Sequence, residues 1–178
     1  MARGVRVSAA VDRLGAYWEL TKPRITYLVL VTTFSGMWVA AGGMPNPLLV
    51  FLTLLGTGLA AGSSSTLNNF IDRHVDALMD RTSKRPLPTG RVSPTEALVL
   101  GIALGAASFA LLATAVNLLA AALAVGTIFF YVVLYTALLK RRSPWCTSIG
   151  GIPGAAPPLI GWAAVSGDLA TPAWVLFA

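Results

Sequence analysis

Three oxygen-bearing side chains recur at every fourth position in one stretch of the sequence. Asn68, Asp72 and Asp76 have this spacing, so on an α-helix they would lie along one face. Two carboxylates and an amide oxygen make a set of hard oxygen donors. Mg²⁺ binds to such donors, usually taking one or two carboxylates and completing its shell with substrate phosphates. The spacing is therefore compatible with a magnesium site.

Basic side chains follow this acidic stretch directly. Arg81, Lys84 and Arg85 come shortly after the second aspartate, and they could donate hydrogen bonds to the outer oxygens of a diphosphate. Acidic residues for a metal, followed by basic residues for phosphate, suit diphosphate chemistry. From spacing alone the alternative stays open that these charges form a solvated face, with Asp72 and Asp76 paired to Arg73.

Two neighbours fall outside this array. Asp80 continues the four-residue spacing, but a helix rises about 1.5 Å per residue and would place it about 18 Å from Asn68. We expect it at the helix end or in a loop. His74 is the one histidine of the chain, and we expect it to face solvent or lipid headgroups rather than to bind a metal.

The elements that carry these residues are expected to span a membrane. The 178 residues are 56% hydrophobic and only 11% charged, whereas soluble domains have about 25% charged residues. This composition excludes a soluble enzyme, a disordered tail and a nucleic-acid-binding domain. We expect an all-α multi-pass protein whose surroundings are the lipid bilayer, with no nucleic-acid partner.

Apolar runs long enough to cross the hydrocarbon core predict five complete spans and the start of a sixth. They cover residues 25–41, 47–67, 97–116, 118–139, 147–165, and from 171 to the last residue. Glycines and prolines interrupt the fifth run. It is either the wall of a cavity, where protein covers irregular backbone, or a kinked packing helix. Glycine pairs four residues apart (58 and 62, 101 and 105, 150 and 154) predict close helix packing.

The distribution of cations predicts the orientation. All thirteen lysines and arginines precede the first span, separate the second from the third, or follow the fourth. By the positive-inside rule these segments are cytoplasmic. We expect residues 1–24 to form a cytoplasmic arm and residues 25–178 a membrane domain.

The motif Asn68-x3-Asp72-x3-Asp76, with Arg81-Thr82-x2-Arg85-Pro86 after it, resembles the first aspartate-rich motif of the UbiA superfamily of intramembrane prenyltransferases. Residues 20–24, 79–82, 135–141 and, most specifically, 150–162 are similar to the haem O synthase branch of that family. The resemblance runs in order along nearly the whole chain.

This resemblance implies a UbiA-type helical bundle that transfers a farnesyl group from farnesyl diphosphate to the vinyl group of protoheme, converting haem B to haem O. It implies a bacterial inner membrane and, as candidate partners, haem A synthase or oxidase assembly proteins. Asp72 and Asp76 would be catalytic and, with Asn68, would bind Mg²⁺. The expected diphosphate contacts are Arg81, Lys84 and Arg85, and the further candidate substrate contacts are Lys22, Arg24 and Tyr135.

Two departures from the family pattern stand out. His74 replaces the middle acid of the Asp-Arg-Asp-x-Asp pattern usual in this branch, while Asp72 and Asp76 remain. The family also has a second aspartate motif in a later cytoplasmic loop, and the sequence ends at Ala178 without it. We therefore expect the N-terminal portion of a longer enzyme, inactive alone.

Two other functions are compatible with parts of the pattern. A UbiA-type enzyme could prenylate a quinone precursor or another aromatic ring. A small-molecule transporter would also use a span broken by glycine and proline. It would, however, place polar residues near the bilayer midplane, whereas the predicted spans have almost none and the acids lie at the cytoplasmic edge.

Overall fold

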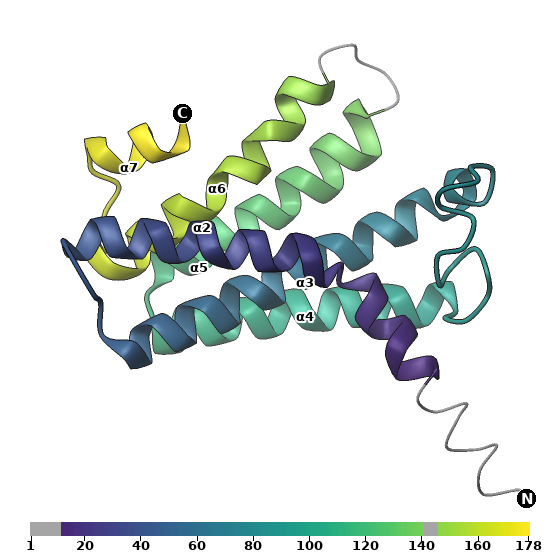
Figure 1. Ribbon diagram of the computed structural model, residues 1–178, viewed down its shortest axis with the longest axis horizontal. Helices are drawn as coiled ribbons and strands as arrows, with labels where there is room; N and C mark the ends of the chain where they lie inside the picture. The colour runs from purple at the N-terminus through teal and green to yellow at the C-terminus, as the bar shows by residue number, and fades with distance from the viewer. Residues whose placement is uncertain (1–11, 141–145) are drawn as a thin grey trace, which may run out of the picture.

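The computed structural model describes residues 12–140 and 146–178, without the side chains of residues 146–148, and within these ranges it is helical with no strand. Residues 12–20 form a helical arm ahead of the bundle. The bundle consists of α2 (Pro23–Ala41), α3 (Pro47–Asp76), α4 (Pro94–Ala115), α5 (Leu118–Phe129), η1 (Phe130–Leu139), α6 (Cys146–Ser166) and α7 (Thr171–Phe177) (Figure 1).

Short polar side chains fix where the helices begin. Asn46 caps α3 by accepting hydrogen bonds from the backbone of the first turn, and Asn117 caps α5 in the same way. Ser93 and Glu96 form a reciprocal capping box at the start of α4. Such caps satisfy backbone N–H groups that have no partner inside the helix.

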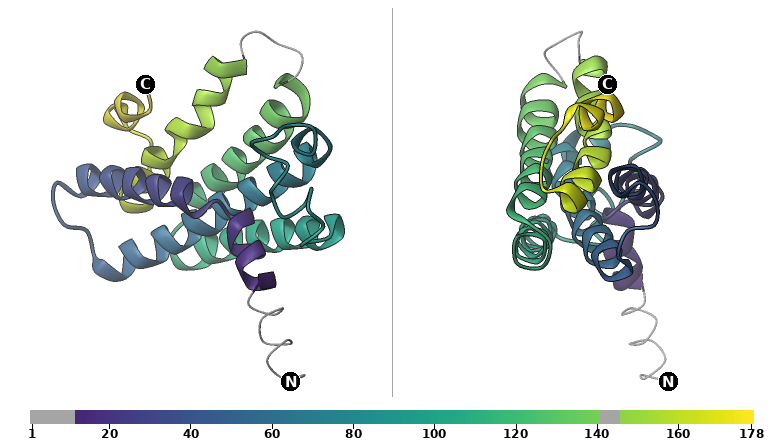
Figure 2. Two further views of the ribbon diagram at one scale, coloured as in Figure 1. Left: turned by 45° about the vertical axis from the view of Figure 1, so that its right-hand side comes forward. Right: turned by 90° about the vertical axis from the view of Figure 1, so that its left-hand side faces the viewer.

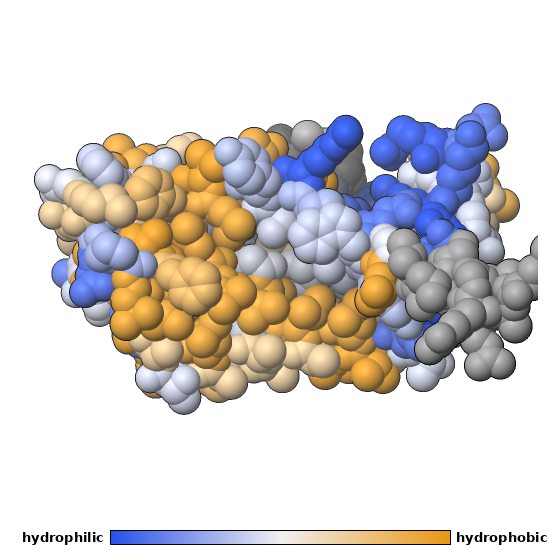
Figure 3. Space-filling model, turned by 60° about the horizontal axis from the view of Figure 1, so that its bottom comes forward, coloured by the Kyte–Doolittle hydropathy of each residue, from blue (hydrophilic) through white to orange (hydrophobic). Residues whose placement is uncertain are grey.

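Four helical segments are long and apolar enough to cross a membrane: α2, α3, α4 and the continuous pair α5–η1 (Leu118–Leu139). They coincide with the first four predicted spans. The predicted fifth span coincides with α6 and the predicted start of a sixth with α7, and their crossing of a membrane stays a prediction. A space-filling view shows a broad apolar surface beside a hydrophilic end (Figure 3).

Close helix contacts at small residues hold the bundle together. The principal contacts pair α3 with α4 and α2 with α6. A Cβ at Gly161 would collide with the carbonyl oxygen of Thr33, and a Cβ at Gly36 with that of Pro158. On α4, Gly101 lies against Leu67 and Gly105 against Ser63, as the glycine spacing predicted.

The connections separate into two ends (Figures 1 and 2). The arm, the loop of residues 77–93 and the end of η1 lie at one end, and the turns at 42–46, 116–117 and 167–170 lie at the other. The described lysines and arginines all belong to the first end. Arg3, Arg6, Arg141 and Arg142, which also entered the orientation argument, lie outside the described residues.

Candidate functional site

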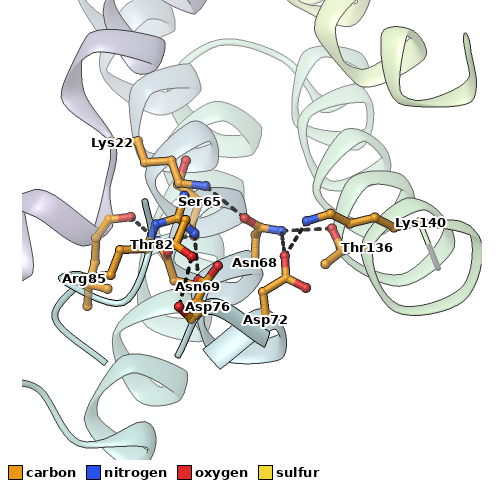
Figure 4. Close-up of polar contacts among 11 residues, drawn as sticks. Lys22, Ser65, Asn68, Asn69, Asp72, Asp76, Thr82, Arg85, Thr136 and Lys140 are labelled. Atoms are coloured by element: carbon orange, nitrogen blue, oxygen red, sulfur yellow. Dashed lines mark hydrogen bonds and ion pairs between the residues drawn. The ribbon is translucent and has the colours of Figure 1, made fainter. Parts of the chain in front are cut away.

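The polar face of α3 is buried within the bundle. Asn68, Asp72 and Asp76 are only 4%, 3% and 5% exposed, and one uninterrupted helix places all three on the same side (Figure 4). Carboxylates are almost never this buried unless they are paired. The burial therefore demands compensating charge from elsewhere in the chain.

Three cationic side chains supply that charge from three different elements: the start of α2, the loop of residues 77–93 and the end of η1. The contacts are Lys22 Nζ to Asn68 Oδ1 at 2.8 Å, Arg85 Nη1 to Asp76 Oδ2 at 2.7 Å, and Lys140 Nζ to Asp72 Oδ2 at 2.6 Å. Figure 4 shows the three cations pointing toward the same helix face. The site therefore combines buried oxygen donors with cations that can also bind an anion.

Further hydrogen bonds hold these groups in place. The Asn68 amide nitrogen donates to Asp72 Oδ2 at 3.1 Å and to Thr136 Oγ1 at 3.3 Å. The Thr82 hydroxyl donates to the carbonyl oxygen of Asp76 at 3.0 Å. Thr136 belongs to η1, a π-helical segment, and such wide turns occur frequently at functional sites.

Lys22 has an unusual position at the junction between the arm and α2. Its backbone is left-handed, with φ 50° and ψ 64°, a conformation that few residues other than glycine adopt. Burial lowers the pKa of its ammonium group to about 8, and the nearby charges of Arg85 and Lys140 act in the same direction. The crowding of cations makes this end of the site attractive to an anion.

A cavity of about 180 Å³ adjoins this polar cluster. Its polar lining includes Lys22, Ser65 and Tyr131. The remaining walls come from α2, α3, α5 and α6, with small and apolar residues such as Ala61, Ile128 and Gly154. The interrupted helix α6 forms one wall of the cavity and also packs tightly on α2. Both interpretations of its glycines and prolines, as a cavity wall and as a packing helix, therefore hold at different positions.

The structure brings together some of the predicted site residues and separates others. Lys22 and Arg85 join the buried face of α3, whereas Arg24, Arg81 and Lys84 are exposed. Tyr135 stacks on Tyr131, with ring centroids 5.5 Å apart.

The two residues that were expected outside the site, His74 and Asp80, lie where the sequence predicted. His74 and Asp80 are exposed, and Asp80 follows the end of α3. Arg73 donates to the carbonyl oxygen of Phe70 at 2.6 Å and lies over its ring. Because both aspartates are buried beside Lys140 and Arg85, a simple solvated face does not describe this segment.

Lys140, Thr136 and Tyr131 were not among the predicted site residues. Lys140 entered the sequence argument only as a loop cation and as part of a family-like stretch, although it contacts Asp72 across a sequence separation of 68 residues. Its one local signal is a position at the cytoplasmic edge of a predicted span, the same edge as the aspartates. No spacing rule pairs residues so distant in sequence.

Comparison with known proteins gives a consistent result. Residues 29–178 match the model of the UbiA prenyltransferase family. The protoheme IX farnesyltransferase of Synechococcus elongatus is 55% identical over 93% of this chain and 52% of its own length. That of Gloeobacter violaceus is 52% identical over 97% of this chain and 58% of its own length. The chain thus spans little more than half the length of the curated relatives it matches.

Solved structures share the fold. A digeranylgeranylglyceryl phosphate synthase structure superimposes with a TM-score of 0.82 at 22% identity, covering 93% of this chain and 57% of that one. A UbiA homologue from Archaeoglobus fulgidus, bound to GPP and Mg²⁺, gives a TM-score of 0.71 at 25% identity, covering 91% of this chain and 58% of its own.

Proposed function

The chain belongs to the UbiA prenyltransferase family, and on this premise we propose that its protein transfers a farnesyl group from farnesyl diphosphate to the vinyl group of protoheme. The observation that carries the chemistry is the buried pair Asp72 and Asp76, with three cations beside it, next to an apolar cavity. The choice of substrates is supported by relatives named protoheme IX farnesyltransferase, which are 47–55% identical over most of the chain.

The polar cluster would act on the diphosphate. Ionisation breaks the bond between the first carbon of the farnesyl chain and its oxygen, and the diphosphate leaves with the electron pair. Lys22, Arg85 and Lys140 are held in advance where they can stabilise that charge. A bound diphosphate would give these cations new anionic partners and free the oxygens that they now contact.

The donor set of α3 suits a magnesium ion. Asn68, Asp72 and Asp76 offer only oxygen ligands, of which two are carboxylates, and this is the ligand chemistry that Mg²⁺ prefers. When bound, Mg²⁺ would neutralise part of the charge that develops on the leaving diphosphate. Arg81 and Lys84, exposed nearby, would contribute a weaker, screened attraction for the same anion.

The cavity would shelter the allylic part of the reaction. Its largely apolar lining keeps bulk water from the farnesyl cation until the electron pair of the protoheme vinyl group forms the new carbon–carbon bond. Water then adds to the resulting cation and loses a proton, which gives the hydroxyethylfarnesyl side chain. Arg24 and Tyr135 remain proposed substrate contacts near the end of the bundle that carries the cations.

The same proposal places the protein in a bacterial inner membrane. We infer that α6 is a fifth span and α7 the start of a sixth, and that the end bearing the described cations is cytoplasmic. Haem A synthase or oxidase assembly proteins are the proposed partners, because they would receive the product.

The test is to express the complete reading frame that encodes this chain in a bacterium that lacks haem O synthase and to determine the masses of the extracted haems. We expect a haem heavier than protoheme by one farnesyl group and one hydroxyl group. If the protein accumulates in the membrane and only unmodified protoheme is found, the proposed substrates are wrong.

A further inference from the structure

The two glycines of the 150 and 154 pair have different surroundings. A Cβ built at Gly150 would meet the ring of Tyr135, so that glycine permits close packing. A Cβ built at Gly154 would meet no heavy atom within 4 Å among the residues that the structure describes. Gly154 lines the cavity together with its neighbours Pro153 and Pro157. The packing role predicted from glycine spacing therefore holds for Gly150 and is wrong for Gly154.

Gly154 lies part of the way down the cavity. On α6 the lining residues run from Gly150, which lies against Tyr135 of η1, to Ile160, which belongs to the buried core. At about 1.5 Å of rise per residue, Gly154 lies about 6 Å from Gly150 and about 9 Å from Ile160 along α6.

At Ile160 the cavity borders the buried core of the bundle. Ile160 is 2% exposed and Ala124 is fully buried, and both belong to one core cluster with Ala60. A larger side chain at the alanines would overpack this cluster and disturb the fold. At Gly154, by contrast, a larger side chain has room and would reduce the space beside α6 without displacing backbone.

We propose that the missing side chain at Gly154 sets the length of the prenyl chain that the cavity accepts. This inference rests on the proposed function, because it takes the cavity to hold the prenyl chain. Glycine inside a helix lowers helix stability relative to alanine, and among the described residues no close helix contact at Gly154 offsets that cost. The open space left beside α6 allows a longer chain to continue toward Ile160.

The experiment compares Gly154→Leu with Gly151→Leu in the complete reading frame. Gly151 lies on the same helix, is also exposed, and has equally open surroundings among the described residues, but it does not line the cavity. The kcat/KM of each variant is measured with geranyl, farnesyl and geranylgeranyl diphosphate. Gly154→Ala is also measured, because its smaller side chain is easier to accommodate and the preference can still be compared if the leucine variant does not accumulate.

We expect Gly154→Leu to lower the preference for farnesyl over geranyl diphosphate at least about tenfold, because adding or removing one methylene in an apolar pocket commonly changes specificity by that much. Gly154→Ala should shift it in the same direction by less, and Gly151→Leu should leave it unchanged. Equal preferences in all of the proteins would overturn the inference while leaving the proposed function intact. A wild-type protein that used none of the three diphosphates would instead contradict the proposed function.

Discussion

Asp72 and Asp76 are buried carboxylates whose charges are balanced from outside their own helix. Each lies within 2.7 Å of a cation, Lys140 for Asp72 and Arg85 for Asp76. Breaking a buried pair leaves the remaining charge uncompensated and is costly. These cations therefore stabilise the fold and are also available to bind an anion. A substitution in either pair is therefore expected to affect both the stability of the fold and the binding of an anion.

Arg85→Ala should raise the KM for farnesyl diphosphate about ten- to a hundredfold, because hydrogen bonds to charged groups contribute about 1.5–3 kcal/mol. Arg91→Ala is the matched control, since Arg91 forms an exposed pair with Glu19 in which both side chains are more than 40% accessible, and it should change the KM little. Initial rates at varied farnesyl diphosphate would decide, and equal effects of the two substitutions would contradict the placement of Arg85.

The sequence predicted some of the residues in this cluster but not all of them. The four-residue spacing on α3 predicted a shared face, and the structure shows it. Lys22 and Lys140 reach that face from 46 and 68 residues away, and such contacts depend on how helices pack. The π-helical conformation of η1, which carries Thr136, could not be predicted from the apolar pattern, because the side chains of this segment are equally compatible with an ordinary α-helix.

At the scale of elements, the crossing of α2 and α6 depends on two glycines. Gly36 and Gly161 let each backbone approach a carbonyl group of the other helix. Because the obstacle at each position is backbone rather than a flexible side chain, neither helix can relax locally. The contact holds α6 in position along the cavity, with Gly150 near Tyr135 and Ile160 in the core.

Gly161→Ala should destabilise the protein by about 1–3 kcal/mol, as overpacking of a close contact does. Gly151→Ala lies on the same helix with open surroundings among the described residues and should leave stability unchanged or slightly raised. Thermal unfolding in detergent would compare the two variants. Equal melting temperatures would show that α2 and α6 do not approach as closely as in the structure.

Glycine spacing alone could not distinguish the roles of these helix positions. The pair at 101 and 105 and the pair at 150 and 154 have the same four-residue separation. The first packs against α3 at both positions, whereas in the second Gly150 lies against Tyr135 and Gly154 meets no neighbour within the described part of the chain. Whether a glycine faces another helix or a cavity depends on the arrangement of the bundle.

At the scale of the whole molecule, charge and apolar surface are separated along the bundle. Of the five complete spans that the apolar runs predicted, the first four coincide with helical segments long and apolar enough to cross a membrane. The cations of the described residues gather at one end with the buried carboxylates. The resemblance to UbiA prenyltransferases, stated from motifs, is confirmed by the match over residues 29–178. The cavity beside α6 adjoins the polar cluster, so one bundle offers both the proposed diphosphate site and the proposed prenyl site.

Calorimetric titration with farnesyl diphosphate, on the protein purified from the complete reading frame, decides whether the polar face of α3 binds a magnesium-bound diphosphate. Asp80→Asn is the matched control for Asp72→Asn, because Asp80 is exposed beyond the end of α3. We predict that Mg²⁺ strengthens binding at least about tenfold in the wild type and in Asp80→Asn, and that Asp72→Asn loses this gain, since Mg²⁺ sites of this kind depend on one or two carboxylates. Equal affinity with and without Mg²⁺, or an undiminished gain in Asp72→Asn, would show that this face does not bind a magnesium-bound diphosphate.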